Sequence, residues 1–152
     1  NTGSYLPTSA VPTVSNAMDV GNPSNFARIL AMFRDNHDRL REAISSISVS
    51  DVETLSTIKA VFEASQYILD PHAAVAYSAL KDHLLDHPEQ KGFIFGTAHP
   101  VKFPMVVQEA IGQTPTIPES LGALMKKHKT ALLIPPEYAR FKSTALEIFK
   151  KL

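Results

Sequence analysis

One short apolar segment, residues 91–97, constrains the fold of this chain more than any other feature. It contains Phe93-Ile94-Phe95 without polar alternation, a pattern typical of a strand that is buried on both faces in a parallel sheet. Such a strand needs neighbours, and the chain offers only one further candidate, the brief apolar run at 131–134. The sequence therefore predicts one or two strands whose remaining partners lie outside this chain.

Helical patterns dominate the rest of the sequence. Asn22-Pro23 is a helix start, Ser50-Asp51-Val52-Glu53 matches a capping box, and Asp70-Pro71 begins an alanine-rich helix. Helices are expected from about 24 to 33, near 40–47, at 51–64, from 70 to about 84, at 103–111, at 118–127 and from 136 onward. The predicted fold class is α/β, mostly helical, with one or two parallel-type strands.

Composition excludes several classes of partner. The 15 basic residues balance the 15 acidic ones among 152 residues, so no basic field exists to attract nucleic acid or an anionic membrane surface. No apolar run approaches the roughly 18 residues of a membrane span, and the first residues lack the pattern of a secretion signal. We expect a cytoplasmic protein. The Asn at position 1 fits a piece of a longer chain.

A polar loop at residues 1–23 precedes the first helix. Residues 15–25, at the end of this loop and the start of the helix, are rich in Ser, Asn and Asp side chains. Free N–H groups at a helix start can bind an anion. The alternative is a loop whose Asn and Asp side chains bond their own backbone, and residue type alone favours that alternative.

A second polar segment, Thr97 to Phe103, follows the predicted strand and leads into a helix. Ligands of open α/β sheets bind at such an edge. Lys102 lies near the helix start, where its charge opposes the helix dipole unless an anion is close. A lysine that extends into solvent is an equally good interpretation of the sequence.

Six histidines raise the question of a metal site. His83 and His87 have the spacing that can bind zinc on a helix, but a third ligand would be required and their surroundings are polar, which favours surface histidines. No metal is therefore expected. Asp70 and His72 could form a catalytic pair, although a role as helix N-cap explains Asp70 adequately.

Three stretches in this order resemble the C-terminal part of the threonine synthase family: residues 11–25 (VPTVSNAMDVGNPSN), residues 67–72 (YILDPH) and residues 96–103 (GTAHPVKF). The resemblance implies a lyase of threonine biosynthesis, with pyridoxal 5′-phosphate as cofactor and fold type II architecture, as in the tryptophan synthase beta-like enzymes. That reaction converts O-phospho-L-homoserine and water to L-threonine and phosphate. Residues 1–23 would be a loop lining the active site, and residues 24–152 the C-terminal part of the enzyme domain.

The resemblance also implies roles for particular residues. Thr97 is expected to contact the pyridine nitrogen of the cofactor. The side chains expected to bind substrate are Asn16, Asp19, His99 and Lys102. The Schiff-base lysine and the loop for the cofactor phosphate precede the matched region in the family. The chain is thus expected to need the N-terminal remainder of the same enzyme and to be inactive alone.

Two other readings stay open from sequence alone. One is a different fold type II lyase, which product analysis with O-phosphohomoserine would distinguish. The other is a free-standing, non-catalytic helical module that binds a partner or an anion. The long irregular start and the isolated strand favour a part of a larger enzyme over that module.

The chain alone is expected to form no covalent adduct with pyridoxal phosphate and to make no threonine, because the lysine motif lies upstream. Borohydride reduction after incubation with the cofactor, followed by peptide mapping, tests this. Scattered weak labelling is expected from surface amines. A single lysine labelled stoichiometrically would contradict the prediction.

Overall fold

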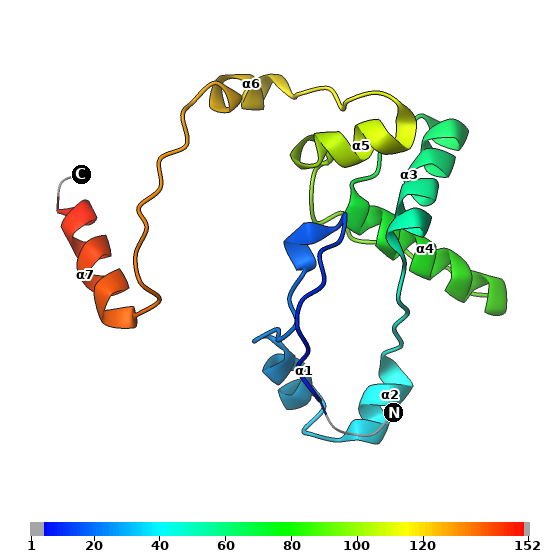
Figure 1. Ribbon diagram of the computed structural model, residues 1–152. Helices are drawn as coiled ribbons and strands as arrows, with labels where there is room; N and C mark the ends of the chain where they lie inside the picture. Colours follow the sequence, from blue (N-terminus) through cyan, green and yellow to red (C-terminus); the bar gives the residue numbers. More distant parts are fainter. Residues whose placement is uncertain (1–4, 151–152) are drawn as a thin grey trace. The chain divides into compact units, whose positions relative to one another are not determined.

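A computed structural model describes residues 5–150 (Figure 1). The chain divides into two compact units, with the boundary in the sequence between Thr116 and Ile117. Across the described residues the regular structure is helical, and none of these helices is long and apolar enough to cross a membrane.

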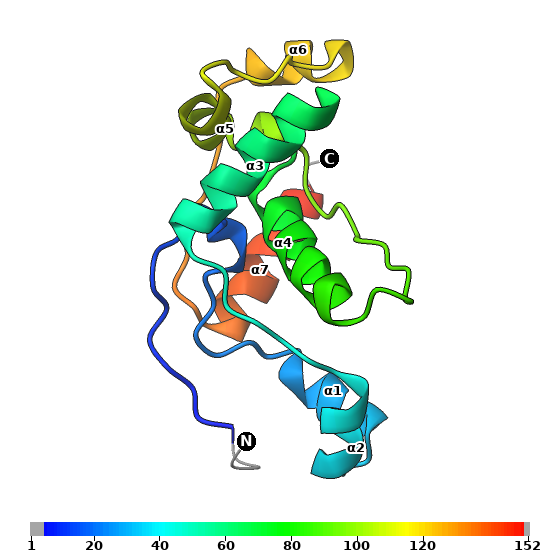
Figure 2. The same cartoon turned by 90° about the vertical axis from the view of Figure 1, so that its right-hand side faces the viewer.

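Three helices form the packed part of the first unit: α3 (Asp51–Ser65), α4 (Pro71–Asp86) and α5 (Pro104–Ile111). Helix α3 contacts both of the others, as the two views show (Figures 1 and 2). The predicted start of α3 is confirmed, since Ser50 Oγ accepts from the backbone N–H of Glu53 at 3.2 Å. Helix α3 is therefore the element around which the first unit is built.

The core lies where α3 meets the start of α4. Ile58 of α3 is fully buried against Leu69, Ala73 and Ala74. The two alanines carry only a methyl group each, so the helix backbones can approach closely at this point. Partly buried apolar side chains complete the cluster, namely Val61, Ile94, Val106, Ala110 and Ile111.

A polar contact also joins α3 to α4. Ser78 Oγ donates to the Glu53 carboxylate at 2.8 Å, and Ser78 is buried. Asp70 is the N-cap of α4, as predicted, and Pro71 occupies its first turn. The N-cap sets where α4 begins, and the hydrogen bond from Ser78 to Glu53 holds α4 against α3.

Residues 5–47 contain only short helices: η1 (Asn16–Met18), α1 (Phe26–Met32) and α2 (His37–Ala43). None of these helices contains a fully buried residue. Arg34 and Asp35 adopt positive φ between α1 and α2, and Asn36 then caps α2 by accepting from Arg39 N at 3.0 Å. The helix expected at 40–47 therefore begins earlier and ends earlier than predicted.

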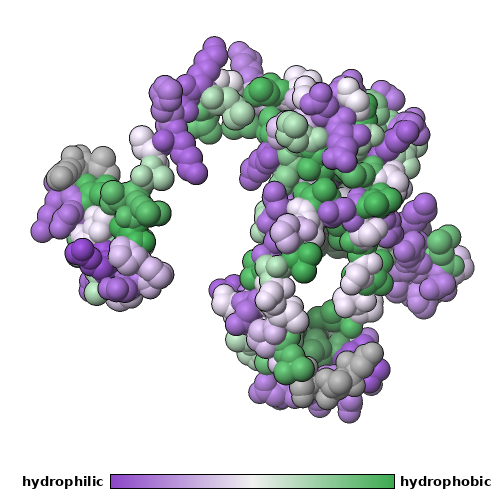
Figure 3. Space-filling model, viewed as in Figure 1, coloured by the Kyte–Doolittle hydropathy of each residue, from purple (hydrophilic) through white to green (hydrophobic). Residues whose placement is uncertain are grey.

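The second unit contains α6 (Glu119–Met125) and α7 (Tyr138–Phe149). No residue of 117–150 is fully buried. Apolar side chains are visible on the surface of α7 in the space-filling view (Figure 3), and Tyr138, Phe141 and Phe149 are all exposed. Within its own unit, α7 therefore has an apolar face without apolar cover.

The two predicted strands do not form in the part of the chain that the structure describes. Residues 91–97 and 131–134 have no strand pairing. Phe93 and Phe95 are 78% and 75% exposed, while Ile94 between them packs against the core, so the segment is covered on one side only. A strand is defined by a hydrogen-bonded neighbour, and none of the described segments supplies one. The strand part of the predicted fold class is corrected accordingly.

Replacement of Ile58 by alanine should destabilise the full-length protein by about 2–5 kcal/mol, because it removes buried methyl groups and leaves a cavity. Val52→Ala is the matched control, since Val52 lies on the same helix and is 79% exposed. Chemical denaturation should detect a clear shift for Ile58→Ala and less than about 0.5 kcal/mol for the control. Equal effects would contradict the assigned core.

Candidate functional site

The polar loop at residues 13–19 is organised around the carboxylate of Asp19. Its Oδ2 accepts from Thr13 N at 2.9 Å, and its Oδ1 accepts from Thr13 Oγ1 at 2.6 Å. Ser15 Oγ lies 3.1 Å from Thr13 Oγ1. Both oxygens of Asp19 are thus engaged within the loop, as the self-contained interpretation of this segment anticipated.

Further contacts attach this loop to the rest of the first unit. Thr8 N donates to Gly21 O at 3.2 Å, and Val14 N donates to Asp51 Oδ1 at 3.2 Å at the start of α3. A methyl group at Gly21 would collide with the backbone oxygen of Thr8, so the close approach requires glycine. Asn16 begins η1 and is exposed.

The second polar segment is a tight turn, η2 (Pro100–Lys102), just ahead of α5. His99 caps the turn, because its Nδ1 accepts from Val101 N at 3.2 Å. Val101 and Phe103 are buried, whereas Thr97, His99 and Lys102 are exposed. Burial of the two apolar side chains therefore fixes the turn and directs the three polar ones away from the core.

A buried contact between a carboxylate and an imidazole lies beside this turn. Asp70 Oδ1 and His72 Nδ1 are 3.0 Å apart, and the two side chains are only 2% and 9% exposed. The His72 ring is 5.0 Å from the Phe103 ring, tilted by 56°. The Nε2 of His72 is buried and has no hydrogen-bond partner among the described residues.

The sequence predicted Asp70 correctly as a cap. It also raised a catalytic pair of Asp70 and His72, but not the contact of His72 with Phe103. The signal was present in Asp-Pro-His, since a single residue, Pro71, separates the carboxylate from the imidazole at a helix start. The contact with Phe103 could not be read from local spacing.

The five predicted site residues all lie in the first unit, in two groups. Thr97, His99 and Lys102 share the segment that leads into α5, while Asn16 and Asp19 share the loop tied to α3. Between residues 5 and 150, no hydrogen bond joins one group to the other.

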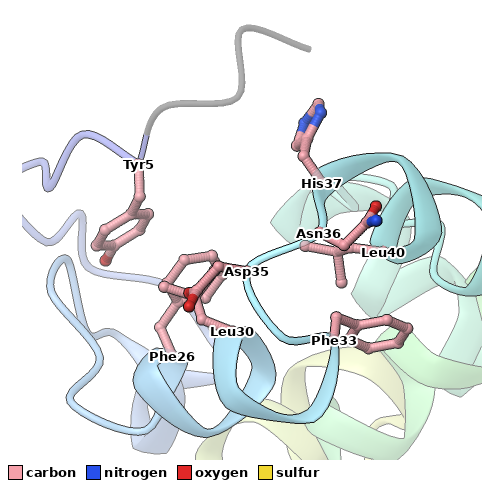
Figure 4. A pocket seen from close by; sticks show the side chains of 8 residues that line it. All are labelled: Tyr5, Phe26, Leu30, Phe33, Asp35, Asn36, His37 and Leu40. Atoms are coloured by element: carbon pink, nitrogen blue, oxygen red, sulfur yellow. The ribbon is translucent and has the colours of Figure 1, made fainter.

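A separate hollow of about 250 Å³ lies near α1 and α2 (Figure 4). Tyr5 stacks on Phe26 at its edge, with ring centroids 4.5 Å apart. Its lining is mainly apolar and comprises Tyr5, Phe26, Leu30, Phe33, Asp35, Asn36, His37 and Leu40. None of the predicted site residues contributes to it.

The histidines of α4 do not form a metal centre in the described part of the chain. His83 and His87 are exposed, as predicted, with ring centroids 4.4 Å apart. His83 Nε2 lies 3.0 Å from Gln90 Oε1. Among residues 5–150, no group of three or more potential metal ligands comes together.

Comparison with known proteins identifies the family. A family model described as "Threonine synthase, C-terminal" matches residues 73–144. The threonine synthase of Serratia marcescens is 40% identical over 120 residues, which cover 79% of this chain and 27% of that protein. The chain belongs to the threonine synthase family. It spans about a third or less of the length of the relatives it matches.

The fold agrees with that of solved threonine synthases. The crystal structure of the Escherichia coli enzyme matches with a TM-score of 0.78 and 32% identity, over 97% of this chain and 33% of that one. A threonine synthase from Brucella melitensis with bound pyridoxal phosphate matches with a TM-score of 0.64 and 25% identity, over 85% of this chain and 32% of that one. The chain thus corresponds to the C-terminal portion of threonine synthase.

Gly21→Ala should disturb the loop, because the added methyl group would collide with Thr8 O. Gly122→Ala is the control, since Gly122 lies in α6, outside both polar segments, and a Cβ there meets nothing within 4 Å. In the full-length protein we expect Gly21→Ala to cost roughly 1–3 kcal/mol of stability, the range of an overpacked site, and to speed proteolysis between 8 and 21. Equal proteolysis of both variants would contradict the close approach.

Proposed function

We propose that this chain is the C-terminal part of a cytoplasmic, fold type II lyase that uses pyridoxal phosphate. The whole enzyme would convert O-phospho-L-homoserine and water to L-threonine and phosphate. The observation that carries the proposal is the match to threonine synthase over 97% of the chain, with a TM-score of 0.78.

The remainder of the same enzyme is the proposed partner of this chain. Phe93 and Phe95 are exposed on an extended segment without strand pairing, and apolar residues of α7 are also exposed. Contact with the remaining domain would cover these side chains and let residues 91–97 join a sheet. A free-standing module, the alternative function, would instead leave them in water.

The segment from Thr97 to Lys102 fits the cofactor and a phosphorylated substrate. His99 Nδ1 accepts from a backbone N–H, so a neutral ring carries its proton on Nε2 and can donate it to a phosphate oxygen. Lys102 is exposed beside the same turn and adds a positive charge. These two side chains would hold the phosphate group as it leaves.

Thr97 would bind the pyridine nitrogen through its hydroxyl. It is exposed at the end of the extended segment 91–97, and a hydroxyl can donate to that nitrogen without forcing its protonation. Pyridoxal phosphate, when bound, supplies the electron sink for loss of phosphate and addition of water. A neutral partner would moderate that sink and favour elimination over transamination.

Asn16 and Asp19 would form the substrate side, in two different ways. The side-chain amide of Asn16 is exposed and can hydrogen-bond to a substrate. Asp19 is half-buried, and both of its carboxylate oxygens accept hydrogen bonds from Thr13. Asp19 would therefore act by shaping residues 1–23, the proposed loop lining the active site, while residues 24–152 form the C-terminal part of the enzyme domain.

Assay of the full-length protein with O-phospho-L-homoserine tests the proposal directly. Equimolar threonine and phosphate are expected, and residues 1–152 alone should release neither. A different amino-acid product would point to another fold type II lyase. No turnover by a correctly folded, cofactor-loaded protein would reject the function.

Thr97→Val should lower kcat/KM of the full-length enzyme by about ten- to a hundredfold, because an unpaired acceptor in a dry site costs roughly 1–3 kcal/mol. The branched shape is kept, so the melting temperature should change little. Thr114→Val is a control on another exposed threonine of the same unit. Normal kcat/KM with an unaltered cofactor spectrum in Thr97→Val would remove Thr97 from the site.

A further inference from the structure

The carboxylate of Asp70 has two tasks at the start of α4. Its Oδ1 accepts from the backbone N–H of His72 at 3.0 Å, which caps the helix, and lies 3.0 Å from the Nδ1 of the same residue. Capping requires only the backbone contact. The contact with the imidazole is therefore additional and needs its own explanation.

The pair holds His72 in one tautomer. An ionised carboxylate only accepts hydrogen bonds, so the bond requires the proton on Nδ1. In the neutral ring Nε2 is then a bare acceptor, and it is buried without a partner among the described residues. An apolar side chain would fill the space without an unpaired nitrogen. Stability alone thus gives no reason for a histidine here, and such departures from local rules are expected near functional sites.

The ring of His72 lies against Phe103, at the junction between η2 and α5. Phe103 N donates to Pro100 O at 2.9 Å and closes η2, and Phe103 O accepts from Val107 N at 3.0 Å in α5. A shift of Phe103 would therefore move the turn and the start of the helix together. The same turn carries His99 and Lys102.

We infer that Asp70 and His72 are positioning residues: Asp70 orients the His72 ring, and the ring, through Phe103, fixes the turn that presents His99 and Lys102 to a phosphate group. This inference rests on the proposed function, in which those two side chains bind the substrate phosphate. Asp70 and His72 themselves are buried behind the turn and touch no substrate.

Asp70→Ser in the full-length protein separates the two tasks of Asp70, because serine is a good N-cap but supplies no carboxylate for His72. His72→Leu removes the imidazole and keeps an apolar contact with Phe103. His87→Asn is the control, since His87 is a half-exposed histidine at the other end of α4.

Inorganic phosphate binding to the cofactor-loaded full-length protein, measured by calorimetry, is the first readout. Asp70→Ser and His72→Leu should each weaken it about tenfold and raise KM similarly, because small misplacements of binding groups are costly. The double variant should be no weaker than either single one, since both act through one ring. His87→Asn should bind as the unmodified protein does.

Amide hydrogen exchange across residues 99–107 is the second readout, and it needs no ligand. Faster exchange there in Asp70→Ser, with little change in melting temperature, is the expected result. Unchanged exchange, phosphate affinity and KM in folded variants would overturn the positioning role. If the unmodified enzyme releases no phosphate from O-phosphohomoserine, the proposed function fails instead, and the exchange measurement still decides whether the pair orders the turn.

Discussion

The close approach of α3 to the start of α4 is the contact on which the rest of the first unit depends. Ile58 fills the space over Ala73 and Ala74, and larger side chains at the alanines would separate the helices. Once α4 is fixed, Asp70 and His72 are fixed with it, and Phe103 packs against His72. Helix α5 joins the same core through Val106 and Ala110. The polar turn at 99–103 thus owes its position to an apolar contact between other elements.

Sequence reasoning succeeded where structure is determined locally. The capping box at Ser50 and the Asp70-Pro71 start placed α3 and α4 closely, because each signal involves residues within one helical turn. The internal bonding of the loop at Asp19 was also anticipated, since carboxylates in polar loops commonly bond nearby backbone.

The failures concern contacts between distant parts of the sequence. Phe93-Ile94-Phe95 has the composition of a buried strand, but strand formation requires a neighbour that the described chain does not contain. The periodicity of apolar residues in a sequence indicates which side chains are buried. It does not indicate which other segment covers them. The sequence paired His72 with Asp70 but missed the contact of His72 with Phe103, because Phe103 belongs to another element.

The exposed segment at 91–97 has a further consequence for the chain in isolation. Its backbone lacks strand partners, and its aromatic side chains face water on one side. Such an edge is a template on which other extended chains can add by hydrogen bonding. Lys91 is the one charge on the segment that opposes such addition. The surface that would join a sheet in the whole enzyme is therefore also where separate copies of this chain would self-associate.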